Sequence, residues 1–193
     1  MLFRWMPLAV LVIAVTVSGY HRAKARRESE TIPRRSEGGA LVAARLLVAL
    51  PLLFVILMYA VSPGRMGWAS FSSPVWSRWL GVALGLAMIP AVHWVLRSLG
   101  RNVSETVLTK SQHELVTHGP YRWIRHPLYT VGLMLLASIG LMTASWLILL
   151  FVLVMAVLMR IIVIPREERN LLGRFGDEYR AYMTRTGRFL PRL

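Results

Sequence analysis

Long apolar blocks alternate with short polar segments along this chain, and the blocks have the length of membrane spans. A transmembrane helix needs about 20 mostly apolar residues to cross a hydrocarbon layer of about 30 Å. The pattern therefore predicts an all-α membrane protein with five transmembrane helices. The expected spans are Leu2–Tyr20, Ala40–Val61, Val75–Leu96, Leu128–Met142 and Ser145–Ile164.

The last two expected spans come from one apolar stretch, Leu128–Ile164, which is too long for a single crossing. The sequence Thr143-Ala144-Ser145 interrupts it, and a serine is well suited to cap the helix that follows. We therefore expect spans four and five to form a tight helical hairpin. In the third span, Gly81 and Gly85 form a GxxxG pattern, which predicts a face for close helix packing.

The polar segment after the hairpin, residues 164–191, has apolar residues at three- and four-residue spacing. This spacing predicts an amphipathic helix, with an interruption near Gly173–Gly176. Such a helix can lie on the lipid headgroups, or it can fold back over residues 97–129 and close a pocket. The apolar positions are Leu171, Leu172, Phe175, Tyr179, Tyr182 and Met183.

The positive charges are unevenly distributed over the polar segments. Six Lys and Arg residues lie in 21–39, five in 97–127 and seven in 165–193, whereas the other flanks carry only Arg4, Arg65 and Arg78. Because basic residues are enriched on the cytoplasmic side, we expect an external N-terminus and a cytoplasmic C-terminus and active site. The overall charge of +14 is then explained by topology and by contact with anionic lipids, and a nucleic-acid partner is disfavoured.

Two further features of the composition narrow the picture. The chain has no Cys, which excludes disulfides, thiolate zinc sites and a cysteine nucleophile. Only Lys24 and Lys110 are lysines among 23 basic residues, and this excess of arginine indicates a GC-rich bacterial genome. The expected location is a bacterial inner membrane.

The stretch HGPYRWIRHPLY, residues 118–129, places polar rings and cations at the entrance of the fourth span. Pro127 can begin that helix without losing a hydrogen bond. A pocket formed where residues 164–191 fold back over this stretch would offer aromatic rings, an apolar wall and the carboxylates of Glu167 and Glu168. These groups suit a ligand with a flat ring and a positive charge, such as S-adenosylmethionine, whereas the carboxylates would repel the phosphates of NADPH. The rings are those of His113, Tyr121, His126 and Tyr129, and the wall is Leu115 and Val116.

Residues 113–129, the following hairpin, EERNLLGRFGDEYRAYM (167–183) and RFLP (188–191) together resemble the isoprenylcysteine carboxyl methyltransferase family. The resemblance begins at about residue 97. It implies a three-span region over 1–96, a catalytic core over 97–193, and methyl transfer from S-adenosylmethionine to a lipophilic or lipidated acceptor. The cofactor contacts that it implies are His113, Glu114, Leu115, Val116, Tyr121, His126, Pro127, Leu128, Tyr129 and Glu167.

The chain departs from this family at the acceptor side. Val163 stands where members that act on prenylcysteine have an arginine, and Arg160, one turn earlier, is the candidate substitute for binding the substrate. Arg125 can hold an acceptor carboxylate, or it can bind lipid phosphate. Glu167 is expected to pair with the cofactor ammonium, the alternative being a surface carboxylate beside neighbouring arginines. Arg125 and Glu167 are thus the candidate catalytic residues.

Two other functions compete with methyl transfer. Sterol reductases contain a similar Arg-His-Pro-x-Tyr stretch and bind NADPH, although they are much longer and lack the glutamate pair followed by FGDEY. A membrane scaffold whose polar segments bind lipid headgroups would bind no nucleotide. The spacing of the histidines predicts no metal site.

Overall fold

The computed structural model describes residues 2–28, 39–103 and 114–192, and helices make up most of these residues. The all-α expectation is confirmed. Six α-helices are joined by short helical turns, which include η2 (Pro63–Ala69), η3 (Gly100–Asn102), η4 (Gly119–Arg122) and the π-helix η5 (Met159–Val163). The α-helices are α1 (Leu2–Glu28), α2 (Gly39–Val61), α3 (Val75–Leu99), α4 (Pro127–Thr143), α5 (Trp146–Leu158) and α6 (Ile164–Arg185).

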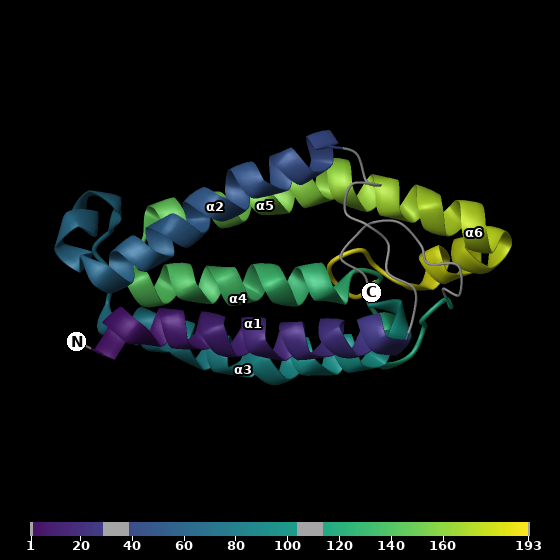
Figure 1. Cartoon of the computed structure of the whole chain (residues 1–193), viewed down its shortest axis with the longest axis horizontal. Helices are drawn as coiled ribbons and strands as arrows, with labels where there is room; N and C mark the ends of the chain where they lie inside the picture. The colour runs from purple at the N-terminus through teal and green to yellow at the C-terminus, as the bar shows by residue number, and fades with distance from the viewer. Residues whose placement is uncertain (1, 29–38, 104–113, 193) are drawn as a thin grey trace.

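The helices form an elongated bundle, in which α1, α3 and α4 run side by side and α2 runs beside α5 (Figure 1). Among the described residues, 4 helical stretches are long and apolar enough to cross a membrane, and α4 is a shorter apolar helix between them. The chain is therefore a multi-pass membrane protein. One end of the bundle carries η2 and the turn between α4 and α5, and the opposite end carries α6 (Figure 1).

The turn between α4 and α5 has the structure expected from the sequence. Ser145 caps α5, because its hydroxyl accepts a hydrogen bond from the backbone N–H of Ile148. Ala144 ends α4 in a left-handed conformation (φ 49°). The Ser145 hydroxyl also donates to the carbonyl of Ala69 at 3.2 Å, so the hairpin turn is tied to η2.

The GxxxG pattern of the third span lies against α4. A Cβ atom added to Gly81 would lie 2.8 Å from the backbone nitrogen of Met142, and one added to Gly85 would lie 2.6 Å from the Met142 methyl group. Neither position has room for a larger side chain, which confirms the expected close-packing face. The fourth helix is thereby fixed against the third.

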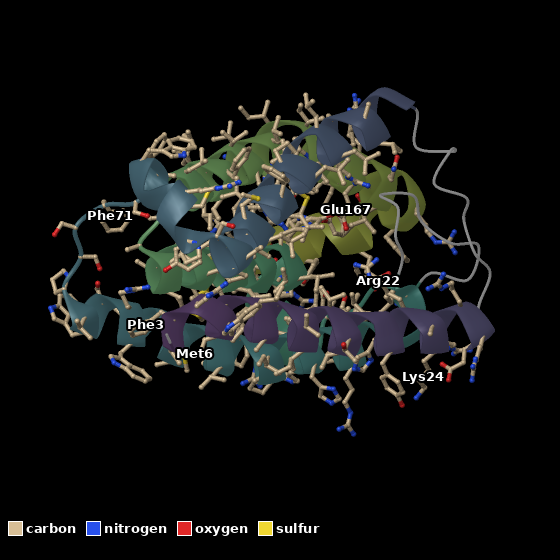
Figure 2. All side chains as sticks on the ribbon, turned by 60° about the vertical axis from the view of Figure 1, so that its left-hand side comes forward. Phe3, Met6, Arg22, Lys24, Phe71 and Glu167 are labelled. Atoms are coloured by element: carbon tan, nitrogen blue, oxygen red, sulfur yellow. The ribbon has the colours of Figure 1, made fainter. Side chains whose placement is uncertain are left out.

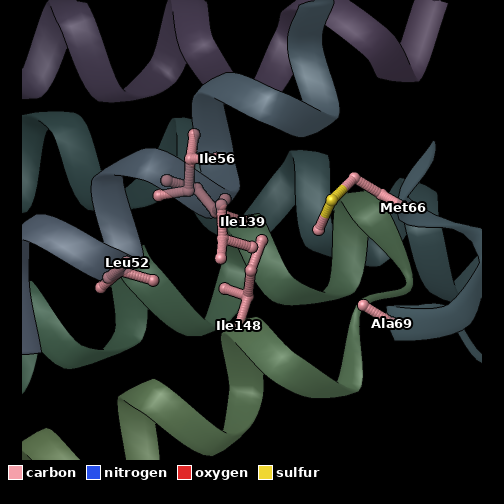
Figure 3. Packing of buried hydrophobic residues seen from close by; sticks show 7 residues of the cluster. Leu52, Ile56, Met66, Ala69, Ile139 and Ile148 are labelled. Atoms are coloured by element: carbon pink, nitrogen blue, oxygen red, sulfur yellow. The ribbon is translucent and has the colours of Figure 1, made fainter. Parts of the chain in front are cut away.

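Two clusters of buried apolar residues hold the bundle together. The first joins α2, η2, α4 and α5 (Figure 3), and the second joins α1, α3 and α4. Both combine residues from before and after position 96, so the N-terminal region and the expected catalytic core share their packing. The first cluster is Leu52, Val55, Ile56, Met66, Ala69, Ile139 and Ile148, and the second is Val10, Ala14, Val82, Leu135 and Met142.

The fifth span continues through η5 into α6, and the helical stretch Trp146–Arg185 has 40 residues. The part before Gly176 measures about 45 Å at 1.5 Å per residue, more than the hydrocarbon thickness of about 30 Å, so the polar α6 extends beyond the apolar span. Gly176 interrupts α6 with φ 52°, at the edge of the region where the sequence predicted an interruption. The expected amphipathic character is also confirmed, since Tyr179 and Tyr182 are buried while Asp177 and Glu178 are exposed.

Candidate functional site

The site is built around the start of α4. His126 is the residue before the helix and Pro127 is its first residue, where the missing N–H of proline costs no helical hydrogen bond. The rings of His126 and Tyr129 stack with their centroids 5.7 Å apart and an interplanar angle of 20°. Because His126 is buried and Tyr129 half-buried, the two rings form a fixed aromatic surface at the end of the helix.

Glu167 of α6 reaches this surface from a distant part of the sequence. The hydroxyl of Tyr129 donates a hydrogen bond to Glu167 Oε2 at 2.8 Å, and His126 Nδ1 lies 3.6 Å from the same oxygen. Burial raises the pKa of the Tyr121 phenol well above its usual value, and the negative charge of Glu167 raises it further. The structure thus brings together Tyr121, His126, Tyr129 and Glu167, which we call the cofactor cluster because the family resemblance implies cofactor contacts for them. Glu167 lies toward the same end of the bundle as Arg22 and Lys24 of α1 (Figure 2).

The adjacent glutamate, Glu168, has different partners. It is buried, and it accepts hydrogen bonds from Arg125 Nε at 3.1 Å and from Arg188 Nη2 at 2.7 Å. Burial raises the pKa of this carboxyl, but the nearby His126 ring and the hydrogen bonds from Arg188 and Arg125 outweigh it and lower the pKa to about 2. Glu168 is therefore ionised at neutral pH and binds two arginines.

The guanidinium of Arg125 is directed toward α6. Its Nε donates to Glu168, and its Nη1 donates to the backbone carbonyls of Met183 (3.1 Å) and Thr186. Only 8% of the side chain is exposed. Through these contacts Arg125 joins the start of α4 to the end of α6, and the donors that make them are not available to an acceptor.

Two buried polar atoms near Glu168 have no hydrogen-bond partner among the described residues. They are Nε2 of His126 and the hydroxyl of Tyr179. The Nε2 atom lies 3.5 Å from Glu168 Oε1, at the outer limit of hydrogen-bond distance. Because a buried polar group without a partner is costly, these atoms mark places where a ligand or water would be stabilising.

The remaining expected cofactor contacts lie at and before the start of α4. Asn102 is buried and binds the backbone of Glu114 twice, by donating to its carbonyl at 2.9 Å and by accepting from its N–H at 3.3 Å. Leu115 and Val116 are half-buried, and Leu128 packs against buried residues of α3. His113 lies outside the described residues.

The structure places Arg160, the candidate for acceptor binding, and Val163 in different environments. Val163 is buried and packs with Tyr129, Met159 and Ile162, whereas Arg160 is exposed. Both lie in η5, and a π-helix has more residues per turn than an α-helix. Residues three apart therefore no longer lie above one another, and the shared face assumed for Arg160 and Val163 is absent.

The sequence pattern did not indicate the roles of three of these residues. Asn102 lies in a polar stretch after a helix, where nothing marks it as buried. Glu168 was expected, with Glu167, to offer negative charge to a ligand rather than to bind two arginines, and Arg188 was noted only as the first residue of RFLP. Their partners lie at 3.5 Å or less in space but 12 or more positions away in sequence, as for Asn102 with Glu114 and Glu168 with Arg188. Among the described residues, no group of three or more His, Cys, Asp or Glu side chains is placed to hold a metal ion.

Comparison with known proteins places this site in a family. Residues 76–178, more than half of the chain, match the model of the phospholipid methyltransferase family. The match begins inside α3, earlier than the resemblance noted in the sequence, and includes the whole cofactor cluster.

Individual relatives agree with this assignment in fold. The solved structure of the eukaryotic intramembrane Ras methyltransferase ICMT (isoprenylcysteine carboxyl methyltransferase) superimposes with a TM-score of 0.54 at 24% identity, covering 79% of this chain and 50% of that chain. The chain therefore spans half the length of that protein.

Three bacterial proteins are similar in sequence. The uncharacterized protein YpbQ of Bacillus subtilis is 25% identical over 74% of this chain and 80% of its own length. The nickel-cobalt-cadmium resistance protein NccN of Alcaligenes xylosoxydans xylosoxydans is 40% identical over 42% of this chain and 37% of its own. The cobalt-zinc-cadmium resistance protein CzcN of Cupriavidus metallidurans is 38% identical over 44% and 38%, respectively.

These findings favour neither the reductase nor the scaffold alternative. The apolar helices, the order of the motifs and the family match all agree on an integral-membrane enzyme that transfers methyl groups. The chain belongs to the phospholipid methyltransferase family.

Proposed function

We propose that this chain transfers a methyl group from S-adenosylmethionine to a lipophilic acceptor at the membrane surface, and that the cofactor cluster holds the cofactor. The proposal rests on the residues that surround the carboxylate of Glu167. Among the described residues no lysine or arginine forms an ion pair with it; its neighbours are the hydroxyl of Tyr129 and the imidazole of His126. A carboxylate without a lysine or arginine partner among these residues suits a ligand that brings a positive charge.

The residues present fit S-adenosylmethionine better than NADPH. Glu167 would hold the ammonium or lie near the sulfonium, the ring of Tyr129 would pack against the ligand, and the unpartnered Nε2 of His126 would bind one of its polar atoms. The two arginines within hydrogen-bond distance of Glu168, Arg125 and Arg188, already donate to that carboxylate. They would therefore compete poorly for the phosphates of NADPH.

The further contacts proposed for the cofactor are those implied by the family resemblance. Glu114 is held through its backbone by Asn102, which would fix the adjacent Leu115 and Val116. Pro127 and Leu128 form the first turn of α4 beside His126. We include His113 in the proposal on the resemblance alone.

The cofactor supplies an electrophilic methyl group on a sulfonium. The chain's own residues have to align the acceptor and exclude water, because methyl transfer is an in-line displacement. Glu167 is the proposed catalytic residue, since its carboxylate would bind the cofactor's positive groups and so orient the methyl group for in-line attack. Arg125 acts as a positioning residue, since its donors are bound to Glu168 and to the end of α6.

The acceptor is proposed to be lipophilic, and the wall formed by Tyr129, Met159, Ile162 and Val163 supports this. The acceptor would reach this wall from the bilayer, while the cofactor would come from the cytoplasm. The cytoplasmic placement rests on the basic flanks. The bacterial relatives support a bacterial inner membrane.

Labelling of native membranes tests the proposal. Membranes that contain the chain are incubated with S-adenosylmethionine labelled at its methyl group, and the lipid extract and the protein fraction are counted separately. We expect label in a lipophilic compound, and none when the chain carries Glu167→Gln. Equal labelling by the variant, or label only in water-soluble products, would contradict the proposal.

A further inference from the structure

The segment Thr186–Leu190, which follows α6, lies across the start of α4, and we call it the strap. The N–H of Arg125 donates to the carbonyl of Gly187 at 2.8 Å, and the N–H of His126 donates to the carbonyl of Arg188 at 3.1 Å. The N–H of Gly187 returns a bond to the carbonyl of Trp123 at 3.2 Å. The strap thus pairs with residues 123–126 in the manner of a neighbouring β-strand.

One side chain of the strap connects this backbone pairing to α6. Arg188 donates two hydrogen bonds to Glu168, from Nη2 to Oε2 at 2.7 Å and from Nε to Oε1 at 3.3 Å. Such a two-point contact fixes the orientation of the carboxylate as well as its position. Glu168 is adjacent to Glu167, so fixing the first glutamate also fixes the rotation of the first turn of α6.

The same contact has a second effect, on His126. Its ring lies within 3.6 Å of both glutamates, and its backbone is bound to the strap. The strap therefore holds His126 from the backbone side, while Glu168 holds the helix that carries Glu167. Two members of the cofactor cluster thus depend on Arg188, although its side chain donates to Glu168 and not to either of them.

We propose that Arg188 is a positioning residue for the methyl-transfer site, and that it acts through Glu168 to set the distance between His126 and Glu167. The proposal rests on the proposed function, because it assigns this geometry to cofactor binding. Arg188 is a better choice than Arg125 for testing it. Its side chain is 32% exposed, compared with 8% for Arg125, so its replacement removes less buried volume, and Glu168 keeps its hydrogen bond from Arg125.

The chain offers a matched control in Arg192. This residue lies in the same C-terminal region, is exposed, and donates to the carbonyl of Thr184 at 2.7 Å instead of to Glu168. We expect Arg188→Ala to weaken the binding of S-adenosylhomocysteine about tenfold, which corresponds to about 1.4 kcal/mol. Arg188→Lys, which keeps the charge but not the two-point contact, should restore part of this loss. Arg192→Ala should bind like the original chain.

The mode of action requires two further readouts. Hydrogen exchange on the ligand-free protein should show faster exchange at the amides of Arg125 and His126 in Arg188→Ala, and unchanged exchange in Arg192→Ala. In a double-mutant cycle with Glu168→Gln, the second change should add little to the first, because both remove the same contact.

The outcomes separate this inference from the proposed function. If the original chain does not bind S-adenosylhomocysteine, the proposed function fails, whereas hydrogen exchange still reports on the strap. If the original chain binds and Arg188→Ala binds equally well with unchanged exchange, the inference is overturned. If the losses from Glu168→Gln and Arg188→Ala multiply in the double variant, Arg188 acts independently of Glu168 and the inference is again overturned.

Discussion

The hydroxyl of Tyr129 donates a hydrogen bond of 2.8 Å to the carboxylate of Glu167, although the two residues are 38 positions apart in sequence. This contact joins the first turn of α4 to the first turn of α6. Among the described residues Glu167 has no lysine or arginine partner, which is the basis of the proposed cofactor site.

The first prediction concerns this bond. Tyr129→Phe keeps the ring that stacks on His126 but removes the hydroxyl, so Glu167 loses its fixed orientation. A hydrogen bond to a charged group contributes about 1.5–3 kcal/mol, so we expect cofactor affinity to fall about tenfold or more. Calorimetric titration with S-adenosylhomocysteine measures the effect, and Tyr20→Phe, on the exposed surface of α1, is the control. Unchanged affinity in Tyr129→Phe would remove this bond from the account.

A second prediction concerns the packing of α3 on α4. Gly81→Ala places a methyl group 2.8 Å from the backbone of Met142, so the helices have to separate. Overpacking of this kind costs about 1–3 kcal/mol, and we expect a lower thermal midpoint in detergent. Gly132→Ala in α4 is the control, since nothing lies within 4 Å of the added atom. Equal midpoints for the two variants would show that the close approach contributes nothing to stability.

Most of the fold could be predicted from the sequence, because apolar length, the Ser145 cap and the GxxxG pattern are local signals. The interruption of α6 at Gly176 was likewise visible as a glycine in a helical pattern. The π-helix η5 (Met159–Val163) could not be predicted from the sequence, because apart from Arg160 its residues are ordinary apolar helix residues. In this segment Val163 is buried and Arg160 is exposed, a difference that α-helical spacing did not indicate.

The candidate site was only partly accessible to sequence reasoning. His126, Tyr129 and Glu167 were proposed from motifs, and the structure brings them together. The different environments of Glu167 and Glu168 could not be predicted, because adjacent identical residues give no sign of which will meet the arginines. The position of Arg125 was equally inaccessible, since its partners Met183 and Thr186 are 58 and 61 residues away.

The acceptor is the subject of a third prediction. Val163 contributes an apolar side chain next to Tyr129. Family members that act on prenylcysteine have an arginine at this position. We expect weak methyl incorporation into a farnesylated cysteine analogue, and an increase of about one to two orders of magnitude in Val163→Arg. Val157→Arg, at an exposed position of α5, controls for the added charge. Efficient turnover by the original chain that survives Arg160→Ala would show that neither position selects the acceptor.

Topology provides a fourth prediction. Because the chain has no cysteine, single cysteines can be introduced and labelled with a membrane-impermeant reagent in intact cells. We expect labelling of Arg65→Cys in η2 and no labelling of Thr184→Cys in α6; both positions are exposed. The reverse pattern would place the cofactor cluster outside the cell, where S-adenosylmethionine is not supplied.

The most direct test of the central claim is a pair of calorimetric titrations of the purified chain, one with S-adenosylhomocysteine and one with NADPH. We expect saturable binding of S-adenosylhomocysteine at one site and no binding of NADPH. In Glu167→Gln the affinity for S-adenosylhomocysteine should fall about tenfold or more. Glu178→Gln, an exposed change on the same helix, should bind like the original chain. Saturable binding of NADPH, or binding of S-adenosylhomocysteine that Glu167→Gln leaves unchanged, would contradict the account.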